Sequence, residues 1–176
     1  RTIMRSDWGE DAVYIFSDVD GGTGYHGHKD DNAIILSAYG RNLLSDQLFY
    51  SYGTGPIKNY LTSAKAHNTI TIDGANQSTT KKGQINHWET NGIYDNPANV
   101  TFGSQGSGRN ENHTRNILYL RSGFVLVSDY VKPYDSDSGE HVYDQYWHMP
   151  PDAKLTLDET SLTARSNVAD EANVQV

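Results

Sequence analysis

The chain has 176 residues, of which 36% are hydrophobic, with a formal net charge of −8 and no cysteine. This length suits one domain with a core of its own. The acidic balance argues against a nucleic-acid partner, which requires a basic face; the lack of cysteine excludes disulfides and thiolate metal sites, and no apolar run approaches membrane-spanning length.

The first third of the chain alternates between short apolar runs and turn residues. Period-2 alternation predicts a strand over 11–19, and the glycines of 21–24 predict a loop. The mostly apolar run over 32–39 predicts a strand that is covered on both faces. A Gly-Arg-Asn turn then leads into a short strand at 42–45. The glycines and proline of 47–63 predict a long loop with one helical turn near its end.

The remaining segments continue the same pattern. Residues 67–73 alternate and stop at Gly74, and the clearest hairpin joins 114–121 to 124–131 through Ser122-Gly123. Further strands are expected at 100–102, 141–148, 155–157 and 162–165, with an acidic loop at 135–140.

Many short strands, with no internal repeat and no long amphipathic helix, predict an all-β fold. We expect an antiparallel β-sandwich with long loops and little helix. Residues 1–176 are interpreted as a single domain. Neither the start at Arg1 nor the end at Val176 reads like a natural terminus, so we expect a fragment of a larger protein.

Three polar residues stand at the edges of candidate strands. His28, Asp46 and His67 are 18 and 21 residues apart. Two imidazoles and a carboxylate that converge would suit a zinc-type site with its fourth position open. Each residue alone is commonplace, since a bare H-x-H is more often a pair of exposed loop histidines. The sequence therefore predicts a metal site on the combination of the three.

Other side chains near these three are candidates for proton transfer. His26 and His28 flank Gly27, so both rings could face one pocket, or one could bind metal while the other meets substrate. Tyr52 and Tyr60 lie in the loop after the Asp46 position, where most tyrosines only pack. A phenol near a metal or a cationic side chain can nevertheless act as acid or base.

Residues 5–78 resemble the C-terminal β-sandwich of the heparinase II/III-like polysaccharide lyases, which also include alginate lyases. The likeness rests on three segments in this order: GYHGHKD at 24–30, GRNLLSD at 40–46 and AHNTITIDG at 66–74. A weaker likeness continues through His113-Thr114-Arg115. The resemblance implies a supersandwich-like fold whose N-terminal partner, an α-helical toroid, is absent from these residues.

The resemblance also implies a site and a reaction. His28, Asp46 and His67 look like the family's metal ligands, for one zinc per chain with a structural role, and His26 looks like the active-site histidine. Family members cleave acidic polysaccharides, such as heparin, heparan sulfate or alginate, by β-elimination. The usual Pro-Gly after the aspartate is Gln47-Leu48 here, which leaves the shape of the following loop open.

Further roles follow from the same resemblance. Tyr52 and Tyr60 are expected to help at the cleavage point, and Arg41, Lys58 and Lys65 to contact the anionic sugar, although such cations are more often solvated surface charges. The parent protein is expected in the periplasm or outside a bacterial cell, with its signal peptide outside this segment. The isolated fragment is expected to be inactive.

Two other classes of protein share some of these features. Cupins also carry H-x-H on a β-sandwich, but they require a Glu four or five residues later, where this chain has Asn32 and Ala33. A non-catalytic carbohydrate-binding module with a structural metal stays open, since the chain holds twelve Tyr and three Trp.

Overall fold

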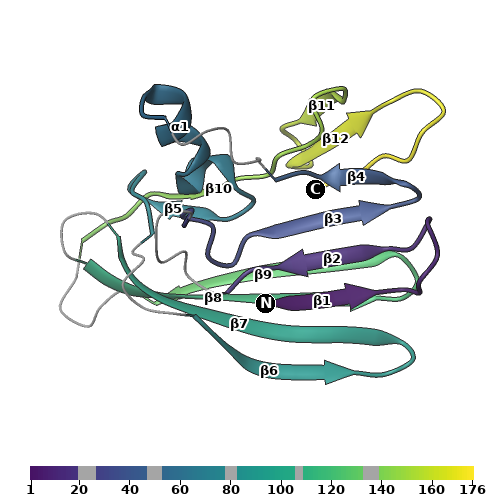
Figure 1. Cartoon of the computed structure of the whole chain (residues 1–176), viewed down its shortest axis with the longest axis horizontal. Helices are drawn as coiled ribbons and strands as arrows, with labels where there is room; N and C mark the ends of the chain where they lie inside the picture. The colour runs from purple at the N-terminus through teal and green to yellow at the C-terminus, as the bar shows by residue number, and fades with distance from the viewer. Residues whose placement is uncertain (20–26, 47–52, 78–82, 106–108, 133–138) are drawn as a thin grey trace.

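The computed structural model describes residues 1–19, 27–46, 53–77, 83–105, 109–132 and 139–176. Over these ranges the chain forms two four-stranded antiparallel sheets and two two-stranded ones (Figure 1). This arrangement confirms the predicted all-β antiparallel fold with little helix.

The first large sheet is a meander in the order β1-β2-β3-β4. Its strands are Thr2–Arg5, Tyr14–Ser17, Ile34–Ala38 and Arg41–Leu44. Alternation turns Met4, Ile15, Ile34 and Leu44 toward the interior. Because one face of the sheet is buried, this pattern fixes the register of the strands.

The second large sheet is a meander in the order β6-β7-β8-β9. Its strands are Gln84–Thr90, Tyr94–Gln105, Arg109–Leu120 and Phe124–Lys132. The predicted hairpin is confirmed, since β8 pairs with β9 from Leu120↔Phe124 to Asn112↔Lys132. Gly123 has a φ of 96° in the turn, a conformation that favours glycine.

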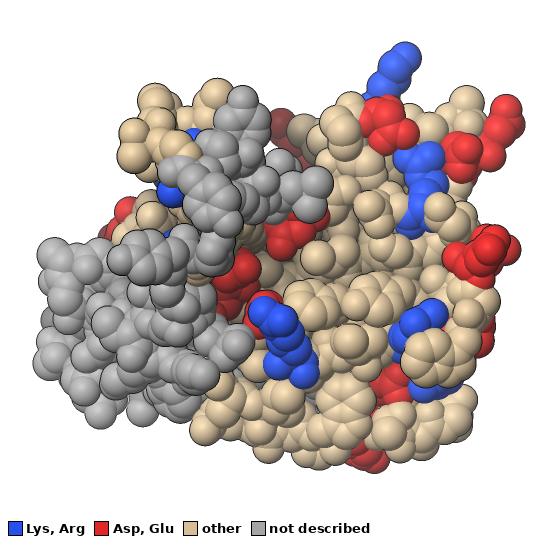
Figure 2. Space-filling model, viewed as in Figure 1, with Lys and Arg blue, Asp and Glu red and all other residues tan. Residues whose placement is uncertain are grey.

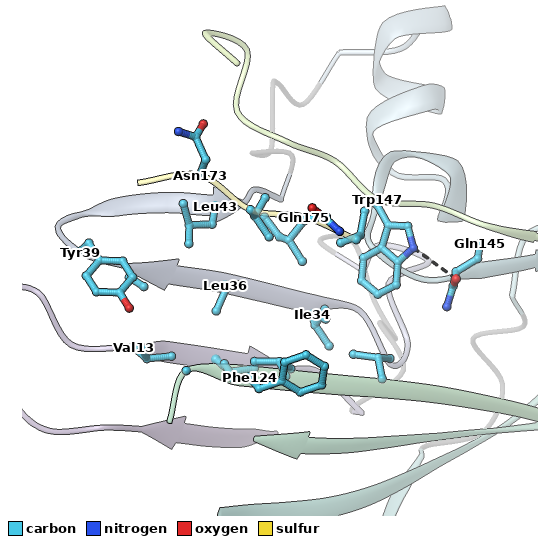
Figure 3. A pocket seen from close by; sticks show the side chains of 18 residues that line it. Val13, Ile34, Leu36, Tyr39, Leu43, Phe124, Gln145, Trp147, Asn173 and Gln175 are labelled. Carbon is cyan, nitrogen blue, oxygen red and sulfur yellow. Dashed lines mark hydrogen bonds between the residues drawn. The ribbon is translucent and has the colours of Figure 1, made fainter. Parts of the chain in front are cut away.

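The two large sheets share one apolar core. Ile117 and Tyr119 of β8 are fully buried against the inward side chains of β1 to β4, and burial of an aliphatic side chain such as that of Ile117 contributes about 1.5–3 kcal/mol. A cavity of about 610 Å³ remains between β3 and β9. Figure 3 shows Leu36, Phe124 and Trp147 around it. None of the predicted site residues that the structure describes lines this cavity.

The short helices and one two-stranded sheet lie beyond the C-terminal end of β4 (Figure 1). The helix α1 (Pro56–Leu61) begins with proline in its first turn, a position that needs no N–H partner, and the 3-10 helix η1 (Ala64–Ala66) follows. β5 (Ile70–Ile72) pairs with β10 (Tyr143–Gln145). Among the described residues, no helix has the length and apolar character to cross a bilayer.

The structure confirms some of the sequence predictions and differs from others. The helical turn predicted near the end of 47–63 is confirmed by α1, whereas η1 was not predicted. The last predicted hairpin is confirmed as β11 (Lys154–Asp158) and β12 (Thr163–Asn167). β1 and β6 were not predicted. A strand was expected over 67–73, but the observed strand β5 is limited to Ile70–Ile72, because residues 67–69 follow the tight turn of η1. The loops predicted at 21–24 and, for the most part, at 135–140 lie outside the described residues.

Candidate metal centre

His67 lies where η1 gives way to extended backbone. The turn of η1 ends on His67, with φ of −121° and ψ of 158°, and the imidazole is fully buried. Its Nδ1 lies 2.5 Å from Oδ1 of Asp46. Its Nε2 is buried and has no hydrogen-bond partner among the residues that the structure describes. A buried polar atom without a partner is costly, so Nε2 marks a place for a ligand.

His28 faces His67 from the segment before β3. The two ring centroids are 5.2 Å apart, with the planes inclined by 41°. One ligand atom each from His28, Asp30 and His67 lies within 4.8 Å of the other two. Neighbouring ligands of a tetrahedral zinc are roughly 3.4 Å apart for bonds of about 2.1 Å. Small side-chain rotations would therefore bring these atoms around one cation.

The protonation of this cluster suits a cation. Burial lowers the pKa of His28, and the charge of His67 acts in the same direction against the carboxylates of Asp30 and Asp46. The lowered pKa favours the neutral imidazole, which is the form that binds a metal. Burial raises the pKa of Asp30, and the nearby carboxylates of Asp18 and Asp46 add to this against the opposing charge of His67. A divalent cation would relieve this repulsion, so the donor set fits such an ion.

The structure thus brings the three predicted ligands His28, Asp46 and His67 to one end of the sandwich. Asp46 contacts the Nδ1 side of His67, and Asp30 lies in the group formed by the two imidazoles. Asp30 was considered in the sequence as a partner of an imidazole. The carboxylates of Asp30 and Asp46 therefore both lie in the group around His67. The assignment of His28, Asp46 and His67 as the metal ligands stays a prediction.

Asn68 holds this centre to the surrounding strands, and sequence reasoning did not find it. Its Nδ2 donates to the backbone oxygens of Ile34 and Ser45, both at 2.8 Å. Its Oδ1 accepts from the backbone N–H of His148 at 2.5 Å. The side chain therefore connects β3, the end of β4 and the segment after β10 directly beside His67.

His148 is the second residue that sequence reasoning missed. Its Nδ1 lies 3.3 Å from Oδ1 of Asn68, and its ring stacks on Tyr146 with centroids 6.4 Å apart. Burial is the main cause that lowers the pKa of His148, and the charge of His67 also lowers it. The sequence carries no signal for this neighbourhood, because 81 positions separate His67 from His148.

The helix α1 lies next to the centre. The backbone N–H of Lys29 donates to the oxygen of Thr62 at 3.0 Å, which joins the segment after His28 to the end of α1. Tyr60 of this helix is 50% exposed, so its phenol is accessible to a substrate. Lys58 lies on the same helix, and Lys65 precedes His67 by two residues with its amine over Gly74.

Arg41 lies at the start of β4, the end of the strand away from Asp46. Its guanidinium pairs with Asp152 at 3.0 Å and with Glu171 at 3.6 Å. Two carboxylates already balance this charge, so these contacts do not favour the predicted role in sugar binding. The predicted catalytic residues His26 and Tyr52 lie outside the described residues.

Charges of both signs share the surface around these elements. Figure 2 shows Lys and Arg side chains as separate groups among Asp and Glu over the described part of this face. Any attraction for a polyanion would therefore come from a few local cations rather than from the net charge of −8.

Comparison with known proteins places this geometry in context. A family model described as heparinase II/III-like, C-terminal, matches residues 16–175. A heparin-sulfate lyase from Pedobacter heparinus is 24% identical over 178 residues, which cover 98% of this chain and 26% of that protein.

Solved structures give the same result for the fold. The crystal structure of a heparan sulfate lyase from Pedobacter heparinus aligns with a TM-score of 0.85 at 22% identity, and a solved structure of a heparinase III gene product aligns with a TM-score of 0.84 at 21% identity. Both alignments cover 98% of this chain and 26% of the other. The chain therefore spans about a quarter of the length of these relatives.

Proposed function

This chain belongs to the heparinase II/III-like C-terminal family, and we propose that it is the β-sandwich part of a polysaccharide lyase. The resemblance found in the sequence is thereby confirmed. The proposed substrate is a uronic-acid-containing polysaccharide, with heparin or heparan sulfate favoured by the heparin-sulfate lyase relative. The reaction is a β-elimination, in which the C5 proton leaves and the O4 bond breaks without addition of water.

The observation that carries the proposal is the group of two imidazoles and two carboxylates, in which Asp46 lies 2.5 Å from Nδ1 of His67 and one ligand atom each of His28, Asp30 and His67 lies within 4.8 Å of the other two. We assign His28, Asp46 and His67 to one zinc ion, with Asp30 as a further carboxylate at its side. The ion, when bound, would hold the three chain segments together and keep the neighbouring active-site histidine in place. Its role is thus structural support of the reacting groups.

The chain's own side chains would then handle the sugar and its protons. A β-elimination needs a positive or hydrogen-bonding group on the uronate carboxylate, a base for the C5 proton and an acid for the departing O4. We assign His26 and the phenols of Tyr52 and Tyr60 to these proton transfers. Lys58 and Lys65, which lie on the α1–η1 side of the centre, would contact the anionic sugar.

The reaction needs more than these 176 residues provide. Because the chain spans 26% of the relatives it matches, we propose that an N-terminal α-helical domain completes the active site and supplies further acid or base groups. The isolated sandwich would then be inactive. We also propose a periplasmic or secreted location for the whole protein, since a polysaccharide substrate would be encountered outside the cytoplasm.

The test is a lyase assay on the protein at its natural full length. Incubation with heparan sulfate, heparin and alginate in parallel should produce the ultraviolet absorbance of an unsaturated uronate, most strongly with one of the first two. Binding of a polymer without any such product would contradict the lyase proposal. That outcome would favour a carbohydrate-binding module, an alternative supported by the exposed rings of Trp8 and Trp88.

A further inference from the structure

A buried guanidinium lies on the inward face of β8 beneath the candidate metal centre. Arg115 is fully buried, and its Nη1 donates hydrogen bonds to the backbone oxygens of Asn32 and Asn68 at 2.9 and 2.6 Å. Asn68 directly follows His67, and Asn32 lies four residues after His28. The guanidinium of Arg115 therefore bridges the two chain segments that carry His28 and His67.

The Asp129 carboxylate of β9 fixes the direction of this guanidinium. Its two oxygens accept from Nε and Nη2 of Arg115, each at 2.7 Å, and from His113 Nε2 and Gln145 Nε2, each also at 2.7 Å. Burial alone would raise the pKa of Asp129, but the hydrogen bonds from Arg115 and His113 hold it far below its ordinary range. A guanidinium held by such a fork cannot turn away from the two carbonyls.

Asn32 shows that the His28 segment depends on this support. Its φ of 60° places the backbone in the left-handed region, which residues other than glycine adopt at a cost that is smaller for Asn than for most. The side chain is fully buried, and its Nδ2 donates to the backbone oxygen of His113 at 3.1 Å. Both the backbone oxygen and the amide of Asn32 are thus held by residues of β8.

We propose that Arg115 is a positioning residue, which sets the separation of the His28 and His67 segments and thereby the cation affinity of the centre. This inference rests on the cation site of the proposed function. Ligands must be held within about 0.5 Å of their working geometry, and loss of a supporting contact outside the ligand set typically weakens metal binding about 10- to 100-fold. Arg115 contacts none of the proposed ligand atoms, so its effect acts through the two backbone carbonyls.

The test compares Arg115→Lys with Arg121→Lys in the protein at its natural full length. Arg121, directly after β8, also pairs with an aspartate, Asp95, at 3.0 Å, and its Nη1 donates to the backbone oxygen of Arg5 at 2.6 Å. Both substitutions keep the charge and remove the planar fork. Chelator competition should show zinc binding about 10-fold weaker in Arg115→Lys and unchanged in Arg121→Lys. Equal zinc affinities in the two variants would overturn the proposal.

Hydrogen exchange on the metal-free protein separates this inference from the cation site itself. Arg115→Lys should speed exchange of the amides of 27–34 and 67–70, and Arg121→Lys should leave them unchanged. If the unsubstituted protein takes up no zinc, the proposed cation site is wrong. If amide exchange in Arg115→Lys equals that of the unsubstituted protein, the positioning role of Arg115 is wrong, whatever the zinc result. If Arg115→Lys does not fold, Gln145→Ala, which removes one donor to Asp129, decides by the same exchange measurement.

Discussion

Arg115 and Arg121 make closely similar contacts at two ends of the sandwich. Each pairs with one aspartate of the second large sheet and donates from Nη1 to backbone carbonyls across the interior. At the Arg121 end the nearer carbonyl, at 2.6 Å, is that of Arg5 in β1, whose register with β2 is already fixed by a strand ladder, and the carbonyl of the next residue, Ser6, lies at 3.4 Å. At the Arg115 end the carbonyls belong to Asn32 and Asn68, which lie outside the strands.

This difference shows how one kind of contact can be redundant in one region and decisive in another. A strand ladder supplies several hydrogen bonds in parallel, so the loss of one guanidinium leaves the geometry determined. A loop segment has no such ladder, and its position depends on individual side chains. Burial acts in the same direction, since Arg121 is 29% exposed at its side chain and Arg115 is fully buried.

The largest expected effect is the loss of bound metal from the candidate centre, with the Arg121 end of the sandwich unchanged. His67→Ala should reduce the bound zinc from about one ion per chain to none, because the substitution removes the proposed ligand that contacts both His28 and Asp46. Elemental analysis of protein purified without added metal measures this. His87→Ala is the matched control, since His87 on β6 is 53% exposed at its side chain. Full zinc content in His67→Ala would remove this residue from the ligand set.

The next effect is on stability and compares the two aspartates. Asp129→Asn should lower the free energy of unfolding by about 3–5 kcal/mol, because it leaves a fully buried guanidinium without its counter-charge. Asp95→Asn should cost about 2 kcal/mol, since its partner Arg121 reaches solvent. Urea unfolding of both variants gives the two values. A larger loss in Asp95→Asn would reverse the comparison.

Acid should reveal the same asymmetry in the unsubstituted protein. The pKa of Asp129 in the folded protein is held well below its ordinary range by Arg115 and His113. In the unfolded chain the same carboxylate takes up a proton at a pH of about 3.9. The stability that this group contributes is therefore complete above about pH 4 and is lost as the pH falls toward the folded-state pKa. In Asp129→Asn, unfolding measured below pH 4 should show a correspondingly weaker pH dependence.

The sequence predicted the regular part of the molecule better than its site end. Alternating apolar residues gave β2, β3 and the β8–β9 hairpin, because burial on one face of a strand leaves a period of two. β6, with every residue exposed, carries no such pattern. Residues 67–69 read as strand by alternation, yet all three are buried and the first ends the turn of η1.

The site itself divides in the same way. Resemblance to a family named His28, Asp46 and His67, and the structure brings them together. The contacts that hold them in place could not be read from the chain, since the Arg115 bonds to Asn32 and Asn68 join residues 83 and 47 positions apart. A buried arginine and an exposed one are indistinguishable in a sequence until the fold determines what surrounds them.

Within the site end, the two carboxylates can be ranked. Asp46→Asn should weaken zinc binding about 10- to 100-fold, because its carboxylate is both a proposed ligand and the partner of Nδ1 of His67. Asp30→Asn should weaken it about 10-fold at most, if Asp30 supports the cation from the side. Chelator competition on the two variants measures both. A larger loss in Asp30→Asn would exchange their roles.

The smallest effect is expected for Arg41, which lies at the end of β4 away from the centre. Its partners Asp152 and Glu171 are 60% and 52% exposed at their side chains, so water screens both pairs. Arg41→Ala should therefore lower the free energy of unfolding by about 1 kcal/mol or less, with zinc affinity unchanged. The KM for the polysaccharide, measured beside Lys58→Ala, extends the test to substrate. A rise in KM for Arg41→Ala as large as that for Lys58→Ala would show that the sugar reaches this far end of the strand.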